Sequence, residues 1–423
     1  MEIEGVPCTS CSLLCDDIVV DVRDNTVTRV LGTCSHGTKR FKELVGARPM
    51  KAAIAEQGGL KEVSVDEALE KAAEILKVAK KPLIYGGANS TNRTVELLVK
   101  LAQKLRGLYD SSASICHALL DLDPSFLGAR LDDILEDADF ILYWGADPAE
   151  THLRHASRYA VFPRGRSTPM GRESRIVAVV DVRETNTMRI AQHKVLLRPG
   201  SDAELARALR DLMFSKTPTV GEAAGVTLRD LSSIIKDLKP ATYVAMFIGR
   251  GLLQSEKPEE ALSSMAELAR SLLELGKKVS IMPMAEYVNS MGQALITKKL
   301  GGAPRALDFS ALKEHMSPEA TATCQLEREG VDAALIVKSE VSEELTPLAV
   351  KALMRIPTIV LEERATWTFS NGKVSVPLSI MGVESGGTVT RMDGVEVKLK
   401  PFLKPPASVA DEEVFLERLS SSL

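Results

Sequence analysis

Residues 140–145 read FILYWG and residues 175–181 read RIVAVVD. Each is a short, unbroken apolar run, which is the pattern of a strand buried on both faces of a sheet. Similar runs alternate along the chain with amphipathic helical patterns. The runs are residues 82–87, 242–249, 279–284, 333–338 and 357–362, and the helical patterns include residues 64–79, 94–105, 131–137, 202–213 and 258–275. This alternation predicts an α/β fold with parallel sheets covered by helices on both faces. The tail from Trp367 onward is rich in Val, Thr and Gly and is expected to form strands and loops.

Glycine-rich or polar turns follow several of the predicted strands. In an open parallel sheet, ligands bind beyond the carboxyl ends of the strands, where such turns let the backbone approach them. The turns are Gly86-Gly87, Trp144-Gly145, Asp181-Val182-Arg183 and Gly249-Arg250-Gly251. A carboxylate such as Asp181 at a strand end often binds ribose hydroxyls, and Arg183 and Thr185 follow it directly. We therefore expect a nucleotide-like ligand at these turns.

Composition excludes several classes of protein. The chain has 423 residues, enough for two or three domains, and a net charge of −4, which argues against a protein that coats nucleic acid. No run approaches the roughly 18 apolar residues of a membrane span. Residues 1–15 lack the basic and apolar regions of a signal peptide, so a cytoplasmic location is the expectation.

Four of the six cysteines gather near the amino end, in the pattern Cys8-x2-Cys11-x3-Cys15-x18-Cys34. Residues 17–31, with a turn at Asp24-Asn25, read as a hairpin between the third and fourth cysteines. In a reducing compartment such clustering indicates a metal centre. A structural zinc site is one interpretation. Zinc ribbons usually show two separated cysteine pairs, however, and the three-plus-one spacing favours an iron–sulfur cluster.

Cys116-His117 is a second candidate for chemistry, in the stretch DSSASICH that begins at Asp110. The thiolate could act as a nucleophile or bind a soft metal, and the imidazole could move protons near neutral pH. Taken alone, the pair is more typical of a buried cysteine beside a hydrogen-bonded histidine. Cys324 has no nearby partner in the sequence and is expected in the core.

Basic side chains concentrate between residues 154 and 175. They are Arg154, His155, Arg158, Arg164, Arg166, Arg172 and Arg175. Guanidinium groups suit phosphate or an acidic partner surface, while a solvated positive loop is an equally good interpretation.

Several stretches together resemble a known family. The cysteine quartet is followed in order by WGADP from Trp144, DVRET from Asp181 and RPGSD from Arg198. This order resembles the molybdopterin oxidoreductases, and among them the family formed by the B subunits of formylmethanofuran dehydrogenases. The closest stretches span almost the whole chain; they are residues 110–117, 144–164, 180–202 and 387–397.

The resemblance implies a set of cofactors and of residues that hold them. Cys8, Cys11, Cys15 and Cys34 would hold a [4Fe-4S] cluster. Cys116 would bind tungsten or molybdenum together with two molybdopterin guanine dinucleotides, and His117 would lie beside the metal. The residues expected to bind the dinucleotides are Gly86, Gly87, Asn89, Trp144, Gly145, Asp147, Asp181, Arg183, Thr185, Gly200 and Asp202.

The resemblance also implies a domain layout. Residues 1–48 with part of 371–423 would form the [4Fe-4S] module, residues 49–110 and 295–370 an α/β pterin-binding domain, and residues 111–294 an α/β dinucleotide-binding domain. Single-chain relatives cover the pterins with a C-terminal barrel, which this chain is expected to lack. We therefore expect a separate barrel subunit to cover them.

The implied reaction is the reversible reduction of CO2 to formate, catalysed by an oxidoreductase with an iron–sulfur acceptor. Formate would then be condensed onto methanofuran in a metallohydrolase subunit, and ferredoxin-type subunits would carry the electrons. These subunits, with the barrel subunit, are the expected partners.

Two departures from the family pattern keep alternatives open. Ala118 stands where related subunits commonly have glycine after the Cys-His pair. Residues 282–292 read MPMAEYVNSMG, with Ala285 and Glu286 and no arginine, although relatives place one there near the metal. Arg250 is a possible substitute. A formate dehydrogenase-like activity and a non-catalytic scaffold of the same fold are the alternatives.

Overall fold

The computed structural model describes residues 1–43, 48–57, 59–114, 128–215, 221–255, 257–310 and 318–423. The chain divides into two compact units. Unit 1 comprises Met1–Ser114, Tyr287–Arg391 and Glu396–Leu423, and unit 2 comprises Ile115–Glu286 and Met392–Val395. The finer division of the chain into three domains stays a prediction.

Unit 1 is built on an eight-stranded sheet with the order β15-β7-β6-β16-β17-β18-β4-β5. Its strands are β4 (Ala52–Glu56), β5 (Gly59–Val63), β6 (Pro82–Gly86), β7 (Leu108–Asp110), β15 (Leu307–Asp308), β16 (Ala333–Val337), β17 (Thr358–Glu362) and β18 (Val374–Pro377). The five central strands, from β7 to β18, pair in parallel, while β15, β4 and β5 pair antiparallel at the edges. The carboxyl ends of β6, β16 and β17 therefore lie side by side at one edge of the sheet.

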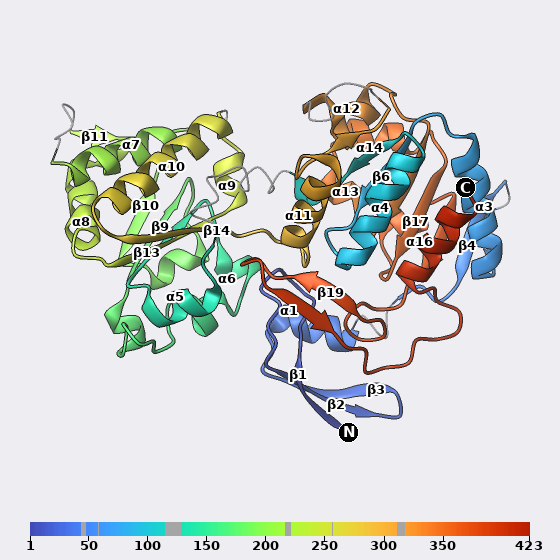
Figure 1. Ribbon diagram of the computed structural model, residues 1–423, viewed down its shortest axis with the longest axis horizontal. Coiled ribbons are helices and arrows are strands. Elements are labelled where there is room, and N and C mark those ends of the chain that lie inside the picture. The colour runs from blue at the N-terminus through green and yellow to red at the C-terminus, as the bar shows by residue number, and fades with distance from the viewer. Residues whose placement is uncertain (44–47, 58, 115–127, 216–220, 256, 311–317) are drawn as a thin grey trace. The chain divides into compact units, whose positions relative to one another are not determined.

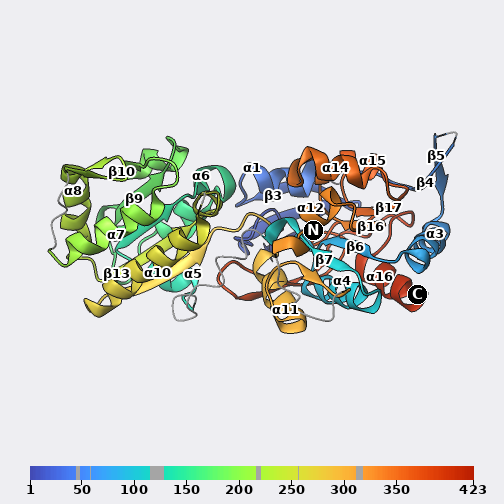
Figure 2. The same ribbon diagram turned by 90° about the horizontal axis from the view of Figure 1, so that it is seen from above.

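Helices cover both faces of this sheet (Figure 2). One face carries α3 (Val65–Val78), α4 (Asn92–Lys104), α11 (Ser290–Gly301) and α16 (Glu412–Ser421), and the other carries α12 (Ala322–Glu327), α13 (Val341–Glu344), α14 (Pro347–Leu353) and α15 (Trp367–Ser370). Alternate residues of one strand enter the two cores. Leu335 and Val337 pack toward α3 and α4, while Ala334 and Ile336 pack toward α14. Apolar residues on both faces are what a parallel sheet between two helical layers requires.

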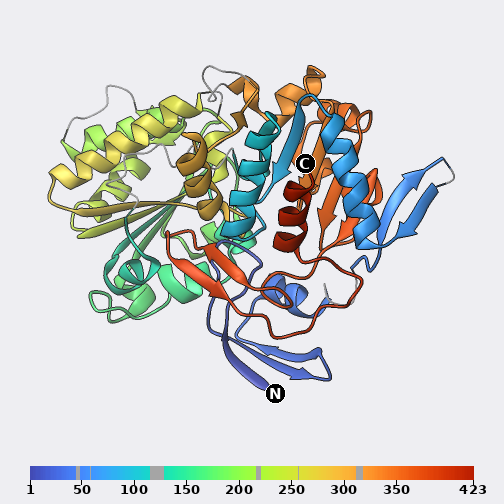
Figure 3. The ribbon, with the colours of Figure 1, turned by 45° about the vertical axis from the view of Figure 1, so that its right-hand side comes forward.

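The amino end of unit 1 is a small antiparallel sheet of β1 (Glu2–Val6), β2 (Ile18–Arg23) and β3 (Thr26–Leu31), drawn in blue in Figure 3. Asp24 and Asn25 both have positive φ, as a two-residue hairpin turn requires, so the predicted hairpin is confirmed. A helical turn, α1 (Ser35–Thr38), and the segment Lys39–Glu43 follow. The hairpin β19 (Gly387–Thr390) and β20 (Glu396–Leu399) comes from the C-terminal part of the chain.

Unit 2 has a five-stranded, fully parallel sheet with the order β10-β9-β8-β13-β14. Its strands are β8 (Phe140–Trp144), β9 (Ile176–Asp181), β10 (His193–Leu196), β13 (Tyr243–Ile248) and β14 (Lys278–Pro283), and its helices are α5 (Leu131–Asp137), α6 (Pro148–Thr151), α7 (Asp202–Met213), α8 (Leu228–Leu238), α9 (Arg250–Leu253) and α10 (Pro258–Glu274). The short strands β11 (Glu222–Ala223) and β12 (Val226–Thr227) pair antiparallel beside it. Helices α7, α8 and α10 pack on one face of the sheet (Figure 1).

The predicted α/β class with parallel sheets is confirmed, and the apolar runs of the sequence form the strands. The tail differs from its expectation, because it also contains the helix α16. Asp411 caps this helix by accepting a hydrogen bond from the Val414 N–H, and Phe415, Leu416 and Leu419 are buried against the sheet. The buried face thus stabilises a helix that residue composition alone did not indicate. No helix in the described ranges is long and apolar enough to cross a membrane.

Candidate functional site

The four amino-terminal cysteines lie close enough together for their charges to interact. Burial raises the pKa of the Cys11 thiol, and the charges of Cys8, Cys15 and Cys34 raise it further. The backbone folds tightly between them: the Cys8 N–H donates to the Cys15 carbonyl over 2.8 Å. Within the described ranges, no three His, Cys, Asp or Glu side chains are arranged to hold a single metal ion. The donors that the loop offers are soft thiols, which suit iron or zinc.

A pocket of about 450 Å³ opens at the carboxyl ends of the unit 1 strands. Its lining comes from two sources. Neighbours of the cysteines contribute Thr9, Ser10, His36, Lys39 and Arg40, and the strand ends contribute Asn89, Lys338, Glu362, Glu363 and Arg364. The cysteine loop and the ligand-binding edge of the sheet therefore meet at one cavity. The predicted binding residue Asn89 lies in its wall and donates its side-chain amide to the Lys338 carbonyl over 3.2 Å.

Gly86 and Gly87 shape this edge of the sheet, as expected for a glycine-rich strand end. Gly86 adopts φ of +122°, and a side chain there would collide with the Val337 carbonyl of the neighbouring strand. Gly87 has φ of +97°. Both positions require glycine because L side chains rarely adopt these angles. The two glycines thus let the backbone turn at the pocket without a protruding side chain.

Arg40 ties the cysteine loop to the strand ends. Its Nε donates to the Thr9 hydroxyl over 2.9 Å, and its Nη2 donates to the Met381 carbonyl over 2.8 Å. Both arms of the guanidinium also bind the carboxylate of Glu363. Burial opposes ionisation of Glu363, but Arg40 and Lys338 outweigh burial and lower the pKa of Glu363 to about 2.

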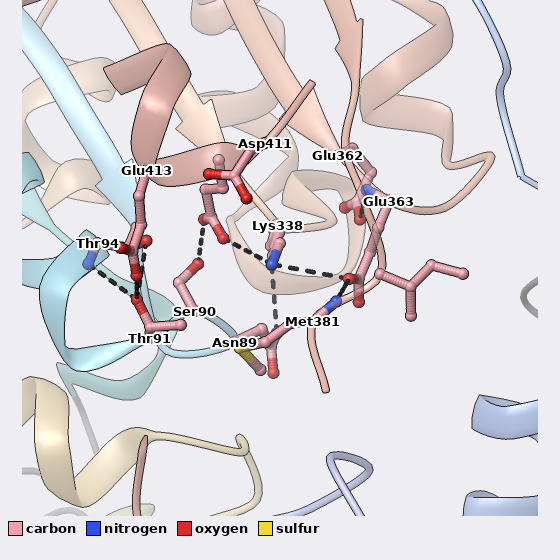
Figure 4. Close-up of polar contacts among 12 residues, drawn as sticks. Asn89, Ser90, Thr91, Thr94, Lys338, Glu362, Glu363, Met381, Asp411 and Glu413 are labelled. Carbon is pink, nitrogen blue, oxygen red and sulfur yellow. Dashed lines mark hydrogen bonds and ion pairs between the residues drawn. The ribbon is translucent and has the colours of Figure 1, made fainter. Parts of the chain in front are cut away.

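Lys338 follows β16 and is almost fully buried at 2% exposure, with its ammonium directed at two carboxylates (Figure 4). Its Nζ lies 2.7 Å from Glu412 Oε2 and 3.7 Å from Glu363 Oε2. Its φ of +48° is unusual for a residue other than glycine. Strained backbone of this kind is often found at functional sites.

Unit 2 has its own pocket, of about 570 Å³, beyond the ends of β8 and β9. Of the predicted binding residues, it contains Asp147, Arg183 and Thr185, and Arg189 and Lys194 add positive charge. Asp147 accepts hydrogen bonds from the Thr187 N–H and hydroxyl, which fixes the loop after β9. Thr185 Oγ1 is buried and has no hydrogen-bond partner among the described residues. The pocket thus combines three cations and an unpaired hydroxyl with the carboxylates of Asp147, Glu150 and Glu184.

Other predicted residues lie at the ends of β8 and β9 and at the start of α7. The indole N–H of Trp144 donates to Asp202 over 2.8 Å, and both side chains are buried. Gly145 has φ of +58°, and a side chain there would lie 2.6 Å from the Leu252 backbone nitrogen. Asp181 ends β9, and Gly200 lies in the turn before α7 with φ of +78°. As binding residues, Trp144, Asp202, Asp181 and Gly200 stay predictions, and so do the other predicted binding residues at both pockets.

The basic run between residues 154 and 175 includes arginines that fasten the fold. Arg175 is buried, and its guanidinium donates to the carbonyls of Ala138 and Val161, at 3.1 and 3.2 Å, and to those of Pro163 and Leu135. Arg172 donates to the Ile190 carbonyl, and exposed Arg166 pairs with Asp137. His155 is buried against Tyr143, and burial together with His152 lowers its pKa to about 3. These residues therefore do not form a shared anion site.

Cys116, His117 and Ala118 lie outside the described residues. In the segment expected to carry an arginine, Ala285 is buried and its carbonyl accepts a hydrogen bond from His152 Nε2 over 3.2 Å. Glu286 and Arg250 are exposed. Cys324, which was expected in the core, is only half-buried on α12.

Sequence reasoning missed several ionic groups inside unit 1, among them Arg40, Lys338, Glu363 and Glu412. One signal was present, because Lys338 and the pair Glu362-Glu363 each end an apolar run. Charged residues at the ends of buried strands lie on the ligand-binding edge of such a sheet. Which of these charges meet depends on the strand order, which the apolar runs do not encode.

Residues 47–345 match the molybdopterin oxidoreductase family. The chain belongs to this family. Along 99% of its length it is 30% identical to the B subunit of the tungsten-containing formylmethanofuran dehydrogenase 2 of Methanocaldococcus jannaschii, of which it covers 97%. Within the molybdopterin oxidoreductases, the chain therefore groups with the B subunits of formylmethanofuran dehydrogenases.

Solved structures of this family's fold resemble the chain at low sequence identity. Acetylene hydratase from Pelobacter acetylenicus matches with a TM-score of 0.72 at 14% identity, over 99% of this chain and 69% of that one. A chain of the formyltransferase/hydrolase complex (FhcABCD) from Methylorubrum extorquens, solved with methylofuran, matches with a TM-score of 0.64 at 20% identity. That match covers 88% of this chain and 98% of the other. At such identities the likeness extends to the fold alone.

Proposed function

We propose that this molybdopterin oxidoreductase is the catalytic subunit of a formylmethanofuran dehydrogenase, which reversibly reduces CO2 to formate. The formate would feed formylation of methanofuran in another subunit. Similarity to the B subunit of the tungsten-containing enzyme over nearly the full length of both chains supports the proposal. The structural observation that carries it is the pocket shared by the cysteine loop and the strand ends of unit 1.

The cysteine loop fits an iron–sulfur cluster by its donor chemistry. Four thiols interact electrostatically, and burial raises the pKa of Cys8, although hydrogen bonds with Ser10 and the cation Arg40 oppose this rise. A buried set of thiolates needs positive charge nearby, which Arg40 and the cluster iron would provide. We therefore propose Cys8, Cys11, Cys15 and Cys34 as ligands of a [4Fe-4S] cluster.

The two pockets fit the anionic ends of pterin dinucleotides. Lys39 and Arg364 bring positive charge to the unit 1 pocket, which Glu362 and Glu363 also line, and Arg183 and Lys194 bring it to the unit 2 pocket. Guanidinium and ammonium groups are the usual partners of phosphates. The unpaired Thr185 hydroxyl and the Asp181 carboxylate could bind ribose or base atoms. We propose one molybdopterin guanine dinucleotide for each pocket.

A tungsten or molybdenum ion in pterin dithiolenes would supply two electrons at one site, and an iron–sulfur cluster would relay them singly. We propose Cys116 as the protein ligand of the metal and His117 as the group that moves a proton beside it. In this assignment Thr9 and Ser10, which lie between Cys8 and Cys11, bring the cysteine loop to the wall of the pocket, and Arg40 fixes the loop on the strand ends.

The expected partners are a barrel subunit, a formyl-transferring metallohydrolase subunit and ferredoxin-type subunits. Formate dehydrogenase-like activity is the second candidate function. It is favoured by residues 282–292, which include buried Ala285 and contain no arginine, although relatives place one in this segment near the metal. A missing cation would weaken stabilisation of a carboxylate-like transition state. A non-catalytic scaffold is the third, but such a subunit would have no use for four clustered thiols.

Analysis of the native complex tests the proposal. We expect about one tungsten or molybdenum and about four iron atoms for each chain, together with pterin. Cys116→Ala should abolish CO2 reduction, whereas Cys324→Ala, the matched control on α12, should not. Methanofuran-dependent activity separates the first candidate from formate dehydrogenase. Absence of pterin, or an active Cys116→Ala variant, would contradict the proposed function.

A further inference from the structure

Two carboxylates, those of Glu363 and Glu412, lie close to the buried ammonium of Lys338, which lines the unit 1 pocket. Glu412 approaches Lys338 Nζ from the first turn of α16. Glu363 approaches it from the end of β17 (Figure 4). Lys338 and both carboxylates are at most 4% exposed. In such surroundings charges interact strongly, because water does not screen them. A change of charge in the pocket would therefore interact strongly with Lys338, Glu363 and Glu412, which we call the trio.

The two carboxylates differ in how firmly their negative charge is held. Glu363 binds both arms of Arg40, lies near Lys338 and accepts the Met381 N–H over 3.1 Å. Glu412 has Lys338 and the Ser90 hydroxyl, which donates to it over 2.5 Å. Accordingly, the pKa of Glu363 falls to about 2, whereas burial outweighs Lys338 and raises the pKa of Glu412. Two carboxylates whose surroundings shift their pKa values in opposite directions serve different roles.

Burial raises the pKa of two carboxylates around the trio, Glu412 and Glu362, and Glu412 is the one that shares the Lys338 ammonium with Glu363. Arg40 is locked by four hydrogen bonds, and Glu362 pairs with Arg364 at 3.5 Å. Lys338 keeps its proton, since Glu412 and Glu363 raise its pKa against burial. The neighbouring Glu413 faces away from the trio, where it accepts a hydrogen bond from Thr91. Glu412 therefore meets only Lys338, Ser90 and the more distant Glu363 among the described titratable and hydroxyl groups.

We propose that Glu412, held between Lys338 and Ser90, is a proton-exchange site that takes up one proton when an electron is added to the centres beside the pocket. One O–H bond forms on the Glu412 carboxylate with a proton from water, and the charge of this proton offsets the negative charge of the added electron. Lys338 stays an ammonium paired with Glu363. On reoxidation the proton leaves again. The inference rests on the proposed function, because redox turnover supplies the change of charge.

Reduced-minus-oxidised infrared spectra of the native complex test this site directly. A protonated carboxyl band should appear on reduction, be absent in Glu412→Gln and persist in Glu413→Gln, the adjacent control. The midpoint potential of the reducible centre should depend on pH in the wild type and be much less dependent in Glu412→Gln. In Lys338→Met, Glu412 loses its cation and should be protonated in both states, so the band should no longer respond to reduction.

A reduction-linked band that survives in Glu412→Gln, or that is absent in a wild-type complex with full metal and pterin content, overturns the inference and leaves the proposed function standing. A complex without metal and pterin overturns both. If Glu412→Gln does not assemble, Ser90→Ala removes only the hydroxyl donor. It should move the carboxyl band to higher frequency, and an unmoved band likewise overturns the assignment to Glu412.

Discussion

The carboxylate of Glu363 accepts both arms of the Arg40 guanidinium, and this ion pair joins the end of β17 to the segment that follows the cysteine loop. The side chains of Arg40 and Glu363 are 10% and 5% exposed. A buried pair of this kind is costly to break, because the remaining partner is left as an uncompensated charge. The contact therefore fixes the cysteine loop beside the pocket.

Glu363→Gln should destabilise the protein strongly, since Arg40 and Lys338 would lose their shared carboxylate. We expect a loss of about 3–5 kcal/mol in the free energy of unfolding, measured by denaturant titration. The exposed pair Arg355–Glu329 is the matched control. Glu329→Gln should change stability by less than about 1 kcal/mol. Equal effects at the two sites would contradict the structural role of Glu363.

Acid stability should report the same ion pair. Arg40 and Lys338 overcome burial and lower the pKa of Glu363 to about 2, whereas an unfolded glutamate titrates near about 4.3. The folded state thus gains stability from the ionised group above about pH 4, and this contribution disappears as pH falls toward 2. Unfolding measured across this window should be less pH-dependent in Glu363→Gln. A slope as steep as in the wild type would be inconsistent with the lowered pKa.

Glu344 should act in the opposite direction. Burial raises its pKa to about 7, although Tyr85 donates a hydrogen bond to it. Because the folded state holds the proton more tightly than the unfolded state, stability should fall as pH rises from about 4 to 7. Glu344→Gln cannot ionise and should be more stable than the wild type at pH 8. Thermal unfolding at pH 5 and pH 8 measures this, with exposed Glu343→Gln as the neighbouring control.

Arg175→Lys should destabilise unit 2, although the charge is kept. The guanidinium donates to four carbonyls, including those of Ala138 and Val161, and an ammonium on a flexible chain cannot reproduce this fork. Each unsatisfied buried carbonyl costs about 1–3 kcal/mol. Arg166→Lys is the control, because Arg166 is 73% exposed and pairs with Asp137 at the surface. Similar melting temperatures for Arg175→Lys and Arg166→Lys would contradict the structural role of the Arg175 guanidinium.

Asp202→Ala should leave the Trp144 indole N–H buried without its acceptor. We expect a loss of about 1–3 kcal/mol, together with a changed fluorescence of Trp144. A Trp367→Phe background removes the only other tryptophan, so that the emission reports one site. Asp202→Asn keeps an acceptor oxygen and should restore most of the stability. Unchanged emission in Asp202→Ala would show that the two side chains do not interact.

The amino-acid sequence by itself determined the α/β class, the positions of the strands, the hairpin after the third cysteine and the grouping of the four amino-terminal cysteines. These features depend on local patterns: apolar runs of strand length, turn residues such as Asp24-Asn25, and spacing along one loop. It also indicated which polar residues, such as Arg183, stand at the ends of strands.

Only the tertiary structure decided which charges meet. Arg40, Lys338, Glu363 and Glu412 come from distant parts of the chain and are neighbours because β6, β16 and β17 lie side by side and α16 returns to cover them. The sequence made Arg175 a candidate anion ligand, but the structure shows that its guanidinium donates hydrogen bonds to buried backbone carbonyls. A charged side chain has the same local signature in both roles. Its role is set by burial and by the partners that the strand order brings to it.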